Sequence, residues 1–238
     1  SRVRVEGGRA VGVEVGGTPV AARRAVLADV DADMLYRRLV GPDHLPPGLL
    51  ARLDRYQRGW PTVKVDWALR APIAWGGDGG AVGAGTVHLA ASLDELTMGT
   101  AELAAGRLPT DPFLVLGQMT TTDPTRSPAG TESAWAYTHV PARRRDEPGG
   151  GHTGRPLAPA DVAEVVARME ARIERYAPGF RDLILARHVL GPKGMEAADA
   201  NLVDGDVGGG TYQLHQQLVF RPVPGLARAE TPVRGLYL

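Results

Sequence analysis

Lys64 is the residue whose type and position in this sequence could most directly support chemistry. Two of the 27 basic residues are lysines, Lys64 and Lys193, so a lysine is less expected here as an ordinary surface charge. Apolar and polar residues alternate over 62–70, which predicts a half-buried strand with Lys64 on its polar face. A cation on such a face can orient a water molecule and stabilise developing negative charge. The alternative is a solvated charge on the open face of a sheet, paired with Asp66.

The segment 133–140 carries three ring-bearing side chains at every second position, Trp135, Tyr137 and His139. In a strand these side chains share one face. They could therefore line an elongated, largely apolar cavity that binds a hydrophobic small molecule. The alternative is that they belong to the core of a sheet packed beneath a helix.

A glycine run, Gly208, Gly209 and Gly210, follows Asp204-Gly205-Asp206 near the end of the sequence. Glycine loses the most backbone entropy on ordering, so this run favours neither helix nor strand. Backbone amides in such turns can form concavities that bind anions. The segment could therefore press its amides toward a cofactor or substrate. The alternative is a loop where the chain crosses between domains.

Several other kinds of chemistry lack the residues they need. The six histidines show none of the usual metal-ligand spacings, so we expect no metal site. None of the serines lies in a G-x-S-x-G motif. The absence of cysteine excludes disulfides and thiolate catalysis and fits a reducing compartment, so we expect a cytoplasmic location.

The composition indicates a globular protein with no polyanionic partner. The chain has 238 residues, of which 43% are hydrophobic, and its 27 basic and 27 acidic residues balance. Nucleic acid is therefore not an expected partner. No apolar run approaches the roughly 18 residues needed to span a bilayer, which leaves only peripheral contact with a membrane open. The preference for arginine over lysine is typical of a GC-rich genome, and we expect a bacterial source.

Hydrophobic periodicity and capping residues predict an α+β fold, with a mixed or antiparallel sheet and helices against one face. Asp31 is a good N-cap, and Ser92 with Glu95 forms a capping box. The segment 25–29 reads as a strand buried on both faces of a parallel sheet. The expected strands are 3–5, 10–15, 20–23, 25–29, 62–70, 87–90, 113–121, 133–140 and 184–190, and the expected helices are 31–40, 46–59, 92–106 and 159–176.

Three short motifs carry a resemblance to a known family. They are G-R-A-x-G-V at 8–13, D-P-T-x-x-P-x-G at 123–130, and Gly-Leu-Tyr-Leu at 235–238. Together they resemble the phytoene desaturase-related FAD-dependent oxidoreductases, including the subgroup of pyridine nucleotide-disulfide oxidoreductase-domain proteins. Read from the residues alone, the motif at 123–130 indicates only a turn.

The resemblance implies a domain layout and a cofactor. Residues 1–30 would be a remnant of a Rossmann-like FAD-binding domain, 31–198 the substrate domain, and 199–238 a segment returning to the FAD domain. The family's G-x-G-x-x-G turn is absent. We therefore expect a truncated fragment that lacks FAD and activity by itself and that self-associates through an exposed flavin-domain interface.

The resemblance also assigns roles to the candidate residues. In the wider amine oxidase and desaturase superfamily, a lysine on a strand of the substrate domain holds a water against the flavin N5, and 59–65 resembles that strand. The glycines at 208–210 would approach flavin or substrate. The implied reaction is hydride abstraction from a hydrophobic, carotenoid-like polyene. The alternatives are a flavin amine oxidase-like enzyme and a non-catalytic domain that binds a ligand or partner.

Overall fold

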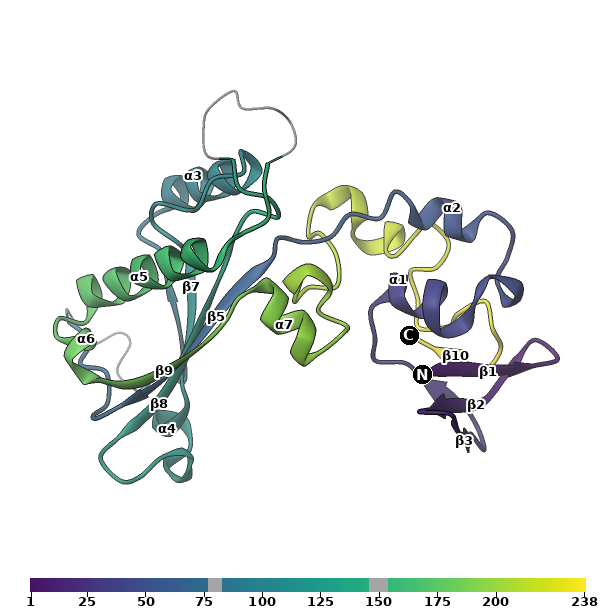
Figure 1. Cartoon of the computed structure of the whole chain (residues 1–238), viewed down its shortest axis with the longest axis horizontal. Coiled ribbons are helices and arrows are strands. Elements are labelled where there is room, and N and C mark those ends of the chain that lie inside the picture. Colours follow the sequence, from purple (N-terminus) through teal and green to yellow (C-terminus); the bar gives the residue numbers. More distant parts are fainter. Residues whose placement is uncertain (77–82, 146–153) are drawn as a thin grey trace. The chain divides into compact units, whose positions relative to one another are not determined.

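The computed structural model describes residues 1–76, 83–145 and 154–238. The chain divides into two compact units, the first formed by 1–59 with 199–238 and the second by 60–198 (Figure 1). The structure thus groups residues 31–59, which the resemblance assigns to the substrate domain, with the first unit. Each unit is described by itself.

The first unit opens with the predicted meander. Strands β1 (Arg2–Glu6), β2 (Arg9–Val15) and β3 (Thr18–Ala21) pair antiparallel in that order. Gly7-Gly8 and Gly16-Gly17 make the two tight turns, and all four glycines have positive φ. This conformation matches the right-handed twist of the flanking strands and favours glycine, which explains the turn chemistry of the sequence.

A short parallel pair joins the early and late parts of the first unit. Strand β4 (Val26–Leu27) pairs with β10 (Leu236–Tyr237). The prediction of a strand at 25–29 buried on both faces is wrong in extent and burial, because the strand has two residues and Leu27 is 80% exposed. Parallel pairing itself is present.

The predicted helix at 31–40 is present, but its second half is a π-helix. Asp31 caps α1 (Ala32–Met34) by accepting a 3.0 Å hydrogen bond from the Met34 amide. The helix continues as η1 (Leu35–Val40) and ends at Gly41, whose φ is 86°. A 3₁₀ turn η2 (Pro42–His44) and the helix α2 (Leu49–Leu53) follow, and α2 is shorter than the predicted 46–59.

The second unit is built on a five-stranded antiparallel sheet with the order β6-β7-β8-β5-β9. This arrangement confirms the α+β prediction. The strands are β5 (Thr62–Leu69), β6 (Thr86–Leu89), β7 (Leu114–Gln118), β8 (Glu132–His139) and β9 (Ile184–Leu190).

The predicted strand at 113–121 ends early, because residues 119–122 form the short helix α4 (Met119–Thr122). The buried carboxylate of Glu132 accepts hydrogen bonds from the amides of Thr120 at 2.7 Å and Thr121 at 3.1 Å. These bonds satisfy amides at the start of the helix. The turn η3 (Pro124–Arg126) comes next.

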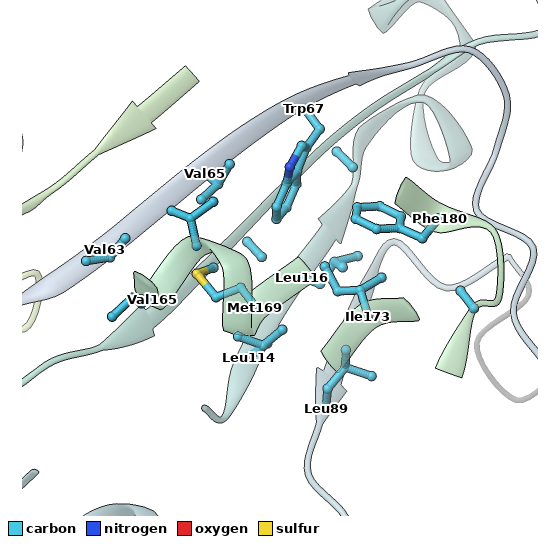
Figure 2. Close-up of a cluster of buried hydrophobic side chains, with 14 of the residues drawn as sticks. Val63, Val65, Trp67, Leu89, Leu114, Leu116, Val165, Met169, Ile173 and Phe180 are labelled. Atoms are coloured by element: carbon cyan, nitrogen blue, oxygen red, sulfur yellow. The ribbon is translucent and has the colours of Figure 1, made fainter. Parts of the chain in front are cut away.

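The helix α5 (Pro159–Tyr176) has the predicted bounds and covers one face of the sheet. Val165, Met169 and Ile173 pack against side chains from β5 and β7, as Figure 2 shows. The alternating residues of β5, Val63, Val65, Trp67 and Leu69, are at most 2% exposed. The remaining helices of this unit are α3 (Leu93–Ala104), α6 (Phe180–Leu183) and α7 (Pro192–Ala198).

The late part of the first unit contains short 3₁₀ turns rather than long elements. These are η4 (Val203–Gly205), η5 (Leu214–Gln216) and η6 (Leu218–Phe220). Among the helices of the described ranges, none combines the length and apolarity needed to cross a membrane.

Asp161, in the first turn of α5, is expected to make the stability of the protein depend on acid pH. Its buried carboxylate accepts hydrogen bonds from Arg155 at 2.5 Å and the Ala158 amide at 2.7 Å, and it also pairs with Arg144. The hydrogen bond from Arg155 is the largest effect that lowers the pKa of Asp161 far below its ordinary value. The stabilisation is therefore complete above the unfolded-state pKa of about 3.9 and is lost as the pH falls toward the lower folded-state pKa.

Asp161→Asn should accordingly lower the free energy of unfolding at pH 7 by about 2–4 kcal/mol. The variant should also flatten the pH dependence below about pH 4, because it removes the titrating group. Urea unfolding at a series of pH values measures both effects. Equal slopes below pH 4 for the two proteins would contradict this role.

Candidate functional site

The aromatic residues of β8 lie on the face of the sheet away from α5, here called the open face. Burial alternates along β8, and Ala134 and Ala136 are 2% and 0% exposed while Trp135, Tyr137 and His139 are half-buried. The three rings are therefore not core beneath α5, which contradicts the alternative interpretation of this segment. They are placed where a ligand could reach them.

The rings form a continuous row along the strand. Trp135 and Tyr137 are stacked at a centroid distance of 6.1 Å, and Tyr137 meets His139 edge to face at 6.0 Å. Trp60, just before β5, lies 6.5 Å from His139. Gly117 of β7 lies under the Trp135 indole, where a Cβ would overlap the ring. This contact explains a glycine that the sequence analysis did not single out.

Lys64 lies on the same open face, directly opposite Tyr137 in the β5–β8 pair. Asp66 is opposite Trp135, and its Oδ2 accepts a hydrogen bond from the Lys64 Nζ at 2.5 Å. The Lys64 and Asp66 side chains are 30% and 41% exposed. The structure thus brings together Lys64 and the three ring residues, and it contains the ion pair named as the alternative. The hydrogen bond holds the ammonium against the Asp66 carboxylate.

A hollow of about 560 Å³ extends the open face beyond Asp66. It is bounded by Ala68 of β5, His188 of β9 and residues Arg126 and Pro128. The last two belong to the motif at 123–130, for which the residues alone indicated only a turn. The motif therefore also shapes one wall of the site. This was the one sequence signal that could have located the hollow.

The loop that carries this motif is fixed by Asp123. The carboxylate accepts hydrogen bonds from the Thr125 hydroxyl at 2.7 Å and the Thr125 amide at 3.0 Å. These bonds lower the pKa of Asp123, with the hydroxyl contributing most. Such a side-chain bond to the backbone two residues ahead is an Asx-turn, which holds the following residues in place.

A smaller pocket of about 120 Å³ lies beside the other end of the aromatic row. His139 and Trp60 form part of its wall, together with Leu96 and Leu103 of α3 and Phe113. The open face therefore has a hollow near Asp66 and an ion pair beside the aromatic row, and a pocket lies at the end of the sheet next to His139.

The glycine loop belongs to the first unit, where its amides are already bound by a carboxylate. Asp206 is 2% exposed and accepts hydrogen bonds from the amides of Gly208 at 2.9 Å and Gly210 at 2.7 Å. It also accepts a 2.7 Å bond from the Gly59 amide. The anion that these glycine amides bind is thus a side chain of the protein itself.

Carbonyls of the same loop are also used within the first unit. Arg221 donates to the carbonyls of Gly208 at 2.5 Å and Gly209 at 2.6 Å, and the Tyr56 hydroxyl donates to Gly209. A Cβ on Gly208 would lie 2.7 Å from the Tyr212 ring. These contacts account structurally for the glycines. A contact of Gly208, Gly209 or Gly210 with flavin stays a prediction.

A buried ion pair lies near this loop in the first unit. Arg58 binds Asp31 through two hydrogen bonds of 2.5 and 2.9 Å, and the Asp31 side chain is 1% exposed. Burial lowers the pKa of Arg58, but the bond and charge of Asp31 outweigh it, and the pKa is raised overall. Arg58 thus stays charged and holds the residues before Gly59 against the helix that Asp31 caps.

Within the described ranges, no group of three or more histidine, aspartate or glutamate side chains is placed to hold a metal ion.

The first unit has exposed apolar side chains at Leu27 and within 207–220, where Leu214 is 86% and Leu218 84% exposed. Self-association through them stays a prediction.

Comparisons with known proteins find relatives that are named as oxidoreductase-domain proteins. No family model matches the chain. Curated relatives include the pyridine nucleotide-disulfide oxidoreductase domain-containing protein 2 of Rattus norvegicus and that of Mus musculus, each 28% identical over 97% of this chain. The chain spans 40% of the length of these relatives. The subgroup name in the sequence-based resemblance is thus supported, whereas the phytoene desaturase-like part stays a prediction.

A solved structure shares the fold. The crystal structure of an oxidoreductase from Methanosarcina mazei matches the whole chain and 42% of its own chain, with a TM-score of 0.52 and 15% sequence identity. This similarity supports the α+β architecture.

Proposed function

We propose that this chain is the substrate-facing part of an FAD-dependent oxidoreductase that oxidises a hydrophobic small molecule. The observation that carries the proposal is the pairing of Lys64 with Tyr137 on the open face of the sheet. This register puts one cation, hydrogen-bonded to Asp66, on the strand next to the row of aromatic rings, and Asp66 also borders a hollow. Relatives named as oxidoreductase-domain proteins support the reaction class.

The open face suits a flat, electron-accepting ring system such as that of flavin. The glycine loop, in contrast, has no free amides for the phosphates of the cofactor at Gly208 and Gly210. The Lys64 ammonium can stabilise negative charge on such a ring, and the aromatic row offers apolar faces. The amides of Gly208 and Gly210 donate to Asp206, so they are not available to a pyrophosphate without rearrangement. FAD, when bound, would accept the hydride from the substrate.

The residues of this chain would then position the reactants. Asp66 holds the Lys64 Nζ in one place. From there Nζ can orient a water molecule, or stabilise negative charge that develops on molecular oxygen at the open face. Trp135 and Tyr137 exclude bulk water and orient an elongated apolar substrate along β8. A carotenoid-like polyene is the substrate class that this row would suit.

Trp135→Ala is expected to weaken substrate binding. The variant removes one ring of the row, and loss of an aromatic contact of this kind costs about 1–2 kcal/mol, or roughly tenfold in KM for a polyene. Tyr176→Ala is the matched control, because Tyr176 is a partly exposed aromatic residue of α5, which covers the opposite face. Unaltered KM in Trp135→Ala would remove the row from substrate binding.

Two further functions have an observation in their favour. The position of Lys64 also suits a flavin amine oxidase-like enzyme, and turnover of primary amines but not polyenes by the protein that carries this chain would select it. The internal use of the Gly208 and Gly210 amides suits a non-catalytic binding domain. A yellow sample of the purified chain would contradict the non-catalytic binding domain, since it would show that the chain itself retains flavin.

A further inference from the structure

The pocket beside His139 is a second cavity of the second unit, distinct from the Lys64–Asp66 pair. It lies between α3, the residue before β7 and the end of β8, and its volume is about 120 Å³. Its lining includes four large apolar side chains, those of Trp60, Leu96, Leu103 and Phe113. Leu96 and Leu103 of α3 line this space, and no residue of α3 is buried. The helix therefore lies over a cavity rather than over packed core.

The two threonine hydroxyls on the pocket wall already donate hydrogen bonds within the protein. The Thr138 Oγ1 donates to the Phe113 carbonyl at 2.7 Å. The Thr100 Oγ1 donates to the Leu96 carbonyl at 2.8 Å. A hydrogen-bond acceptor on a ligand would have to compete with these bonds, which offers little net gain.

The two carboxylates on the wall are neutralised by arginines. Glu95 pairs with Arg172, whose side chain is 0% exposed, and Asp111 pairs with Arg175. Burial raises the pKa of Glu95, but hydrogen bonds from Arg172 and the Ala91 amide outweigh it and lower the pKa overall. Both carboxylates are thus paired with arginines, and they do not call for a cationic ligand.

We propose that this pocket binds a compact apolar group, about the size of a phenyl ring or a branched alkyl group, at one end of an elongated hydrophobic ligand. An apolar protein cavity of about 150 Å³ can hold benzene, which sets the size. That the ligand is the enzyme's substrate rests on the proposed function. His139 belongs to both the aromatic row and the pocket wall and follows Tyr137 by two residues, about 7 Å along a strand. A substrate beside Lys64 would therefore place its end in the pocket.

Gly99 of α3 provides the test, because a Cβ added there meets no atom within 4 Å. Gly99→Leu should fill the pocket without a backbone clash. Ala101→Leu is the matched control, since it adds the same side chain at an exposed position of α3. Toluene is the probe, titrated into the ¹⁵N-labelled chain while the indole N–H signal of Trp60 is followed by NMR.

Saturable shifts of the Trp60 signal are expected for the unaltered chain and for Ala101→Leu, whereas Gly99→Leu should bind toluene at least about tenfold more weakly. Leu103→Ala enlarges the same pocket and should bind naphthalene at least about tenfold more tightly than the unaltered chain does. Equal toluene affinity in Gly99→Leu, or equal naphthalene affinity in Leu103→Ala, would overturn the proposal.

The binding experiment uses neither flavin nor turnover, so it separates this proposal from the proposed function. If toluene binds but Lys64→Met leaves flavin reoxidation unchanged, the pocket proposal stands and the proposed function fails. If toluene does not bind but Lys64→Met slows flavin reoxidation, the proposed function stands and the pocket proposal fails.

Discussion

Lys64→Met, in the protein that carries this chain, is expected to slow reoxidation of the reduced flavin by about a hundredfold while FAD stays bound. Loss of one preorganised charge at a reacting centre typically costs a factor of about 10²–10³. Methionine keeps an unbranched side chain of similar length, so the aromatic row keeps its neighbour. The Lys64–Asp66 pair is substantially exposed, and its loss should cost at most about 1 kcal/mol of stability.

Two companion variants make this experiment specific. Lys193→Met removes the other lysine, which is exposed on α7, and should leave the kinetics unchanged. Asp66→Asn keeps the ammonium but removes the carboxylate that holds it, and should give a smaller loss of about tenfold. Stopped-flow absorbance measures all three. Wild-type kinetics in Lys64→Met would remove this residue from the mechanism.

Asp206→Ala should produce the largest loss of stability, about 3–5 kcal/mol, in the first unit. The variant leaves the amides of Gly59, Gly208 and Gly210 without the carboxylate that they share. A buried donor left unpaired costs about 1–3 kcal/mol. The carboxylate also ties together residues 147 positions apart in the sequence, Gly59 and Asp206.

Hydrogen–deuterium exchange across a urea series can locate this loss. Peptides from 1–59 should lose protection at lower urea in Asp206→Ala, and peptides from 60–198 should not, because the two ranges belong to different units. Asp206→Asn retains one acceptor oxygen and should lose less. Asp43→Ala, at an exposed position of the first unit, should stay within about 0.5 kcal/mol of wild type. Equal losses in both units would contradict a local role for Asp206.

Elements with a strong local pattern could be predicted from the sequence. The alternation in β5 and the apolar stripe of α5 each reflect one buried face, so periodicity located both elements, with identical bounds for α5. The helix at 119–122 was missed because its amides are satisfied by Glu132, a residue further along the chain whose contribution no local propensity reveals.

The sequence could predict which face of its own strand each candidate residue occupies, but not which strands lie side by side. Alternation placed Lys64 on one face of its strand and Trp135, Tyr137 and His139 on one face of theirs. It could not show that β5 and β8 are neighbours, which depends on the order of all five strands. The glycine run was predicted as an irregular segment that could press its amides toward a cofactor or substrate, or as a crossing loop, and its pairing with Asp206 was not foreseen, because nothing in the local sequence shows which carboxylate the amides meet.

Hydroxyl-radical footprinting tests the central claim, that the open face of the sheet meets flavin and substrate, most directly. In the protein that carries this chain, addition of FAD and a polyene should reduce oxidation of Trp135 and Tyr137 and leave Tyr176, on α5, unchanged. Unaltered oxidation of Trp135 and Tyr137, with protection of Tyr176 instead, would contradict the account.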